Sequence, residues 1–125
     1  GAPAVLATPD QRQAFQQKKY DRAVELFDLI HTDHRYYPES RLLAAQAHAL
    51  NDDMKKQVET SEQCFKGAEK LEKDASNDKI KRYFRMVAEI CSINQARHLY
   101  KRGLYDEAIN AYDKIPKKSY KWPYI

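Results

Sequence analysis

The chain has 125 residues, of which 42% are hydrophobic and 32% are charged, and its formal net charge is +4. This length suits one domain, and the balance of apolar and charged residues excludes an intrinsically disordered chain. Three glycines, one of them at position 1, are too few for a phosphate-binding glycine loop or a dinucleotide-binding fingerprint.

The order of capping residues and apolar spacings predicts six helices. Thr8-Pro9-Asp10-Gln11 has the composition of a capping box with proline in the first turn. Asn51-Asp52-Asp53 and residues 74–78 provide turns and caps farther along. The predicted helices cover approximately residues 8–18, 21–30, 38–50, 54–73, 78–103 and 105–115.

The fifth predicted helix is long and changes its apolar side midway. At about 100° per residue, its first apolar set and its second set fall on largely opposite sides. The first half would then be the last part of one helical unit, and the second half would be the first part of the next. A four-helix bundle would keep one buried side along the whole helix, so this pattern disfavours a bundle. The first set is Ile80, Phe84, Val87 and Cys91, and the second is Ile93, Ala96, Leu99 and Tyr100.

A Tyr-Asp-x-Ala phrase occurs twice, within residues 18–30 and 103–115. The second copy and the helix before it resemble a tetratricopeptide repeat: a small residue in the first helix, a Gly-x-Tyr turn, then an alanine and a ring in the second helix. The first copy keeps the tyrosine, the alanine and a ring, at Tyr20, Ala23 and Phe27. The residues that carry the resemblance in the second copy are Ala96, Gly103, Tyr105, Ala108 and Tyr112.

The spacing of the two phrases departs from that family. They lie 85 residues apart, which is no multiple of the family period of about 34. The unit between them, residues 40–71, lacks the Gly-x-Tyr turn. The resemblance therefore implies an all-α, right-handed α-solenoid of antiparallel helix pairs, with about three units, six helices and elongated middle helices. Residues 8–116 would form this domain, residues 1–7 an N-terminal arm, and residues 117–125 a basic, aromatic tail that opens a further repeat.

By resemblance, the function is that of a noncatalytic scaffold or adaptor that binds a protein or peptide on a concave groove. The groove residues are aromatic and cationic in part, which suits a partner of acidic character. Such modules serve in bacterial envelope assemblies, which favours the cell envelope or periplasm, with the cytoplasm as the alternative. The groove residues implied are Arg12, Phe15, Gln16, Ala44, His48, Asn51, Ile93, Arg97, Tyr100 and Lys101.

No residue pattern predicts a catalytic, cofactor or metal site. His31 and His34 flank Asp33 in an inter-helix link, where a surface loop is the favoured interpretation. Cys64 and Cys91 match no metal-ligand spacing. Buried free thiols are the default interpretation, and a disulfide requires that their two helices touch.

Two other functions stay open as alternatives. Residues 1–78 carry a net charge of −3 and residues 79–125 a net charge of +7, so the C-terminal third is a candidate for nucleic-acid binding. Helical spacing, however, separates Lys81 and Arg85 from Arg97 and Lys101, so no continuous phosphate-binding stripe is expected. The second alternative is self-association through Trp122 and Tyr124. No apolar run is long enough to predict a membrane span.

Overall fold

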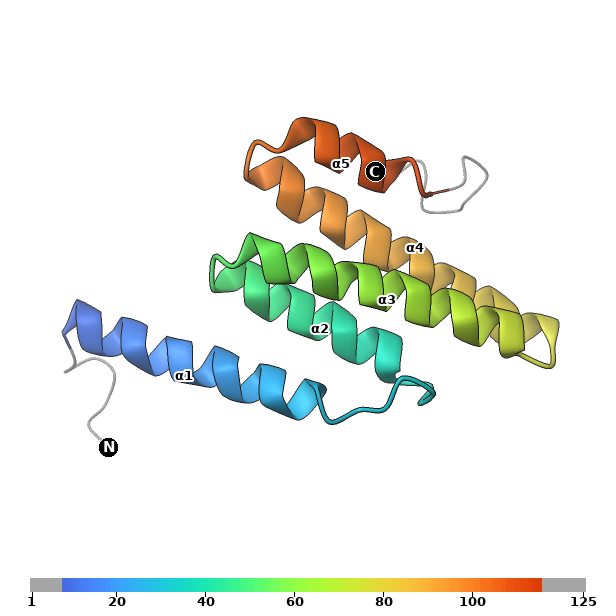
Figure 1. Cartoon of the computed structure of the whole chain (residues 1–125), viewed down its shortest axis with the longest axis horizontal. Coiled ribbons are helices and arrows are strands. Elements are labelled where there is room, and N and C mark those ends of the chain that lie inside the picture. Colours follow the sequence, from blue (N-terminus) through green and yellow to red (C-terminus); the bar gives the residue numbers. More distant parts are fainter. Residues whose placement is uncertain (1–7, 116–125) are drawn as a thin grey trace.

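The computed structural model describes residues 8–115, and these form an all-α structure of five helices. Consecutive helices run antiparallel and follow one another across the molecule from α1 to α5 (Figure 1). Within the described residues, no helix is long and apolar enough to cross a membrane. The helices are α1 (Pro9–Phe27), α2 (Tyr37–Leu50), α3 (Met54–Asp74), α4 (Asp78–Lys101) and α5 (Tyr105–Tyr112).

Helix α1 is continuous where the sequence pattern predicts two helices. Its capping box is present, because Thr8 Oγ1 accepts from Gln11 N–H at 3.2 Å and Gln11 Oε1 accepts from Thr8 N–H at 2.9 Å. The predicted break at residues 18–21 is wrong. That stretch contains no glycine or proline, and the Gln17 amide donates to Asp21 at 3.0 Å across one helical turn. The prediction of six helices therefore becomes five for residues 8–115, and the first Tyr-Asp-x-Ala phrase lies inside a helix.

The α2–α3 and α4–α5 turns share one backbone conformation. Asp52 has φ 63° and Gly103 has φ 77°, so both occupy the left-handed region that ends a helix. In each turn the next residue donates to a carbonyl five positions earlier: Asp53 N–H to His48 at 2.8 Å, and Leu104 N–H to Leu99 at 3.0 Å. The two turns are 51 positions apart in the chain. The turn at Gly103, which precedes Tyr105, therefore corresponds in structure to the turn at Asp52. It does not correspond to the first Tyr-Asp-x-Ala phrase, at residues 20–23.

Helices α3 and α4 have 21 and 24 residues, and their far ends project beyond α2 and α5 (Figure 1). The first half of α4 packs on α3, where Leu42 of α2 also contacts the cluster. The second half packs on α5 and the start of α3. The long helix therefore changes packing partners midway, as its apolar pattern predicts, although Ile80 and Tyr100, one from each predicted set, are 41% and 61% exposed. The first cluster is Cys64, Ala68, Val87, Ala88 and Cys91, and the second is Ala96, Leu99, Ala108 and Ala111.

A disulfide joins α3 to α4. Cys64 and Cys91 lie with their Cα atoms 5.7 Å apart, and both are almost fully buried. The default interpretation of free thiols is therefore wrong. Spacing along the chain could not show this, because the pairing depends on which helix faces meet.

Helix α1 is attached mainly by its C-terminal end. None of its residues is buried, and its N-terminal half extends past the end of α2 (Figure 1). Asp28 follows directly after the last residue of α1. Its Oδ1 atom forms an ion pair with Nη2 of the largely buried Arg41 of α2, at 2.8 Å. Asp33 in the following link pairs with Lys70 of α3 at 2.6 Å. These ion pairs fix the link between α1 and α2 against the rest of the molecule.

Candidate protein-binding face

Helix α2 carries an accessible stripe on the side away from its buried alanines. Residues 39, 43, 46 and 50 recur at steps of three or four, which places them on one side of a helix. Leu43 is 45% exposed and Leu50 is 70% exposed, while Glu39 and Gln46 are half-buried. The stripe therefore offers two large apolar side chains that the described neighbours cover only in part.

Helix α4 carries a matching stripe. Each α2 position has a counterpart 51 residues later, so that Leu43 corresponds to Asn94 and Leu50 to Lys101. Every member of this stripe is partly or fully exposed. The α4 residues are Tyr83, Met86, Ile90, Asn94, Arg97 and Lys101, and together with Glu39, Leu43, Gln46 and Leu50 they define what we call the α2–α4 face.

Contacts between α2 and α4 hold the two stripes beside each other. The helices touch directly. The Tyr83 hydroxyl of α4 also donates a hydrogen bond to the Glu39 carboxylate of α2. This hydrogen bond raises the pKa of Tyr83 to about 12, with partial burial adding to the effect. The Tyr83 phenol therefore keeps its proton at neutral pH and donates it to Glu39. This hydrogen bond lies at one end of the α2–α4 face.

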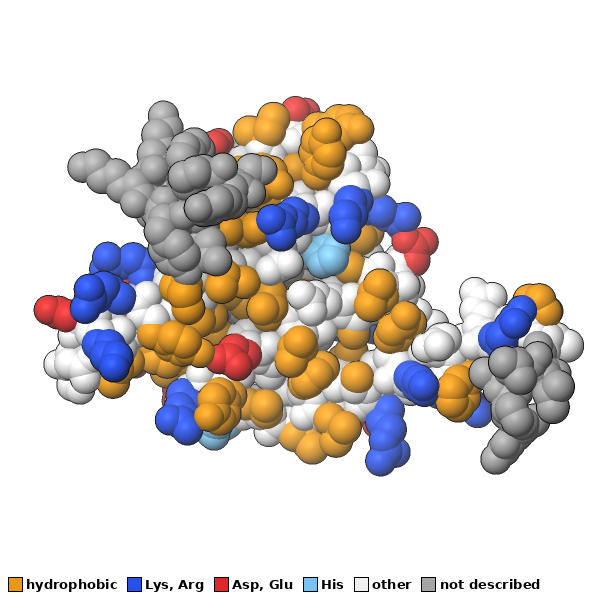
Figure 2. Space-filling view, turned by 180° about the vertical axis from the view of Figure 1, so that it is seen from behind, with side chains coloured by type: hydrophobic (Ala, Val, Ile, Leu, Met, Phe, Trp, Pro, Cys, Tyr) orange, Lys and Arg blue, Asp and Glu red, His pale blue; other side chains and the backbone are white. Residues whose placement is uncertain are grey.

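The other end of the face is cationic. Arg97 and Lys101 are exposed, and within residues 8–115 neither forms an ion pair. In Figure 1 α3 crosses in front of α4, and the reverse view in Figure 2 shows hydrophobic side chains over much of the opposite side, with Lys and Arg side chains gathered above them. The face thus combines apolar area with unpaired positive charge.

Two half-buried histidines lie near the ends of α2 and α4. Burial lowers the pKa of His48, and burial together with the positive charge of Lys101 lowers the pKa of His98. The Nε2 atom of His98 is buried and has no hydrogen-bond partner among the described residues. Both imidazoles are therefore neutral at neutral pH, and the positive charge at this end comes from Arg97 and Lys101.

The structure divides the predicted groove into separate parts. Ala44 is fully buried and Ile93 is 6% exposed, so the prediction that they line an accessible groove is corrected. The exposed ring of Tyr100 points to the α4–α5 turn, where it contacts Tyr105 at 5.2 Å between centroids. Asn51 is half-buried in the α2–α3 turn.

The predicted groove residues of α1 lie apart from the α2–α4 face. Arg12, Phe15 and Gln16 are exposed on the projecting half of α1. The Lys19 ammonium lies 4.7 Å from the centre of the Phe15 ring. Only Arg97 and Lys101 among the predicted residues belong to the accessible stripes, while His48 lies half-buried on the adjacent side of α2.

Sequence reasoning missed Leu43, Leu50 and Ile90. The available signal was the 51-residue spacing between Asn51-Asp52-Asp53 and Arg102-Gly103-Leu104, which aligns the two stripes position by position. Aspartate adopts the left-handed conformation more readily than most residues, so Asp52 can occupy the place that glycine has in the second turn.

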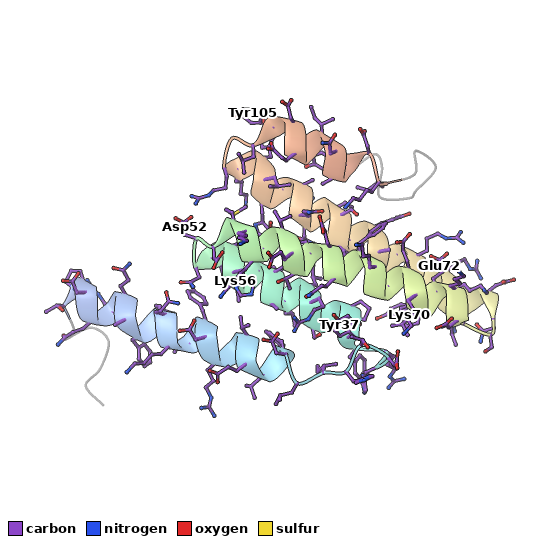
Figure 3. The ribbon with its side chains drawn as sticks, viewed as in Figure 1. Tyr37, Asp52, Lys56, Lys70, Glu72 and Tyr105 are labelled. Atoms are coloured by element: carbon purple, nitrogen blue, oxygen red, sulfur yellow. A yellow bond between two sulfur atoms is a disulfide. The ribbon has the colours of Figure 1, made fainter. Side chains whose placement is uncertain are left out.

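A concave region lies on the projecting ends of α3 and α4, where Figure 3 labels Lys70 and Glu72. It has a volume of about 660 Å³. Its cations are interleaved with carboxylates, and Arg85 pairs with Glu72 at 2.9 Å. Lys70 pairs with Asp33 at 2.6 Å, so two of the four cations in this lining are already paired and only a small positive charge is left to hold a nucleic-acid backbone. The lining residues are Glu69, Lys70, Glu72, Lys73, Lys81 and Arg85.

The link between α1 and α2 uses its histidines as local acceptors. His31 Nδ1 accepts from Asp33 N–H at 3.2 Å, and His34 Nδ1 accepts from Tyr36 N–H at 3.1 Å. In the part of the chain that the structure describes, no three His, Cys, Asp or Glu side chains are grouped as a metal site would need. Trp122 and Tyr124 lie outside the described residues.

No protein-family model, no curated protein and no solved structure matches the chain.

Proposed function

We propose that the chain is a noncatalytic scaffold that binds a segment of a partner protein on the α2–α4 face. The observation that carries this proposal is the pair of matched, accessible stripes on two neighbouring helices. A surface that exposes Leu43 and Leu50 beside Ile90 and Met86 gains free energy when a partner covers it.

The matched turns support a repeat architecture for this scaffold. The pairs α2–α3 and α4–α5 are then successive units of an α-solenoid like that of tetratricopeptide proteins. In such stacks the first helix of each unit contributes to a shared binding surface. Helices α2 and α4 hold this position, and α1 packs against α2 before them.

The charges on the face indicate the chemistry of the partner. Arg97 and Lys101 end the apolar stripe without a partner among residues 8–115. A partner segment with apolar side chains followed by carboxylates complements both parts. Apolar contact supplies most of the affinity, and the charges set orientation and the rate of association.

Selection from a displayed peptide library tests the proposal and requires no identified partner. Peptides enriched on the full chain should lose affinity about tenfold or more with Leu43→Glu/Leu50→Glu or with Arg97→Glu/Lys101→Glu. The matched control is Lys55→Glu with Lys66→Glu, which makes the same charge change on exposed positions of α3. Its binding should equal that of the unaltered chain.

Two results would contradict the proposal. The first is the recovery of no enriched peptide at all. The second is binding that survives both changes on the α2–α4 face, or that falls equally with the α3 control. Helicity and thermal unfolding of every variant should be measured beside binding, so that loss of fold is not mistaken for loss of a contact.

Self-association is a second candidate, favoured by the outer side of α5. Tyr105 is 57% exposed and Ile109 is 55% exposed on the last helix of the described stack. An open terminal helix of a solenoid is a natural contact for another copy. Sedimentation equilibrium of the full chain should then show a mass that rises with concentration and returns to the monomer value with Ile109→Glu. A constant monomer mass would rule this candidate out.

A further inference from the structure

We infer that Cys64–Cys91 is a structural disulfide, made in an oxidising compartment and sealed from thiol reductants in the folded protein. The bond joins α3 and α4, the two longest helices of the described chain, near the middle of each.

The geometry around the cysteines suits a bond better than two thiols. Their Cα atoms are 5.7 Å apart, within the usual range for disulfides. Ala68 lies one turn after Cys64 and Ala88 lies one turn before Cys91, and both are almost fully buried. These small side chains let α3 and α4 approach closely at this level, so the two sulfur atoms are brought within bonding distance.

The same packing closes the bond to solvent. Cys64 is 0% exposed and Cys91 is 1% exposed. Leu42 of α2 and Phe65 of α3 pack against the cluster that surrounds them. A reducing thiolate must reach one sulfur along the S–S axis, so exchange requires that α3 and α4 separate first.

Formation of the bond needs an oxidant that the chain does not contain. The two thiols together lose two protons and two electrons. A donor disulfide of the thiol-oxidoreductase class accepts them: the first thiolate attacks it, and the second displaces the donor from the mixed disulfide as a dithiol. Compartments that maintain such donors are oxidising, whereas thiols in the cytosol are generally kept reduced.

The first test traps the thiol state in the cells that produce the protein. Acid quenching, denaturation and alkylation, followed by mass measurement, should show no alkylated cysteine in the chain. Alkylation of both Cys64 and Cys91 in the trapped sample would overturn the inference. Reduction of the same sample before alkylation should label both residues, which controls for access of the reagent.

The second test measures how fast dithiothreitol reduces the purified full chain. Reduction in native buffer should be slower than in denaturant by on the order of 100-fold or more, because the bond is exposed only by opening. Leu42→Ala thins the cover from α2, so it should accelerate native reduction while leaving the rate in denaturant unchanged. Equal rates in native buffer and denaturant would show that the bond is not sealed.

Discussion

Removal of the disulfide tests how much of the stability comes from covalent constraint. Cys64→Ala with Cys91→Ala deletes a cross-link between residues 27 positions apart. For a closed loop of this length, the chain-entropy relation gives a loss of about 3.5 kcal/mol at 25 °C. Alanine is preferred to serine, because a serine hydroxyl would lie unpaired in an apolar cluster.

Urea and thermal unfolding, followed by far-UV circular dichroism, measure this loss. For a domain of this size, 1 kcal/mol corresponds to roughly 4 °C, so the thermal midpoint should fall by about 14 °C. The unaltered chain, fully reduced in denaturant and refolded with reductant present, should show a similar midpoint. A loss below about 1 kcal/mol would refute the reasoning, since it would mean that the unfolded chain gains little freedom when the bond is absent.

Three further changes probe the turn, the histidines and the face. Gly103→Ala should cost about 1 kcal/mol in urea unfolding, because φ is 77° while a Cβ there would meet no heavy atom within 4 Å; an unchanged midpoint would contradict this. The lowered pKa values of His48 and His98 mean that the unfolded chain binds protons more readily, so the free energy of unfolding should be constant between about pH 6.5 and about pH 9, where tyrosine does not yet ionise, and fall as pH decreases below about 6.5. His48→Gln with His98→Gln should flatten that decline, and an equally steep decline would show that other groups cause it. Leu43→Ala with Leu50→Ala should cost only about 1 kcal/mol of stability, since Leu50 is 70% exposed and Leu43 is 45% exposed, yet weaken peptide capture.

Local signals along the chain predicted the starts of α1, α3 and α4 well. The Thr8 capping box, the Asp53 cap and the Asn77 cap all hold backbone N–H groups as their residue types indicate. Each of these depends on residues within one helical turn of each other. Such short-range chemistry is readable from sequence because no distant neighbour alters it.

The break predicted at residues 18–21 shows where a repeated phrase misleads. Tyr105 follows Gly103, whose left-handed backbone ends α4, whereas Tyr20 follows two lysines that favour a helix. The same phrase is therefore compatible with a turn in one place and a helix interior in the other. The residue at the turn position, not the phrase after it, decides the outcome.

The face could be predicted only in part, because exposure depends on neighbouring helices. Helical spacing alone places Arg97 and Lys101 on one side, and the structure agrees. Leu43 and Leu50 are large apolar residues of a kind that is often buried, and only the positions of the neighbouring helices leave them accessible. Likewise, the pairing of Cys64 with Cys91 follows from which faces of α3 and α4 meet.

The composition of the core connects the disulfide with the exposed face. Within residues 8–115, eight of the fifteen buried hydrophobic residues are alanines, and each buries little apolar area. Alanines let the helices approach closely, but the packing they provide stabilises the fold less than larger side chains would. The covalent link between α3 and α4 compensates for this weakness. Larger groups, such as Leu50 at 70% exposed, stay at the surface, where their burial becomes available to a partner instead of to folding. A small-residue core stabilised by a disulfide is therefore physically consistent with a surface that gains its remaining apolar contacts from another molecule.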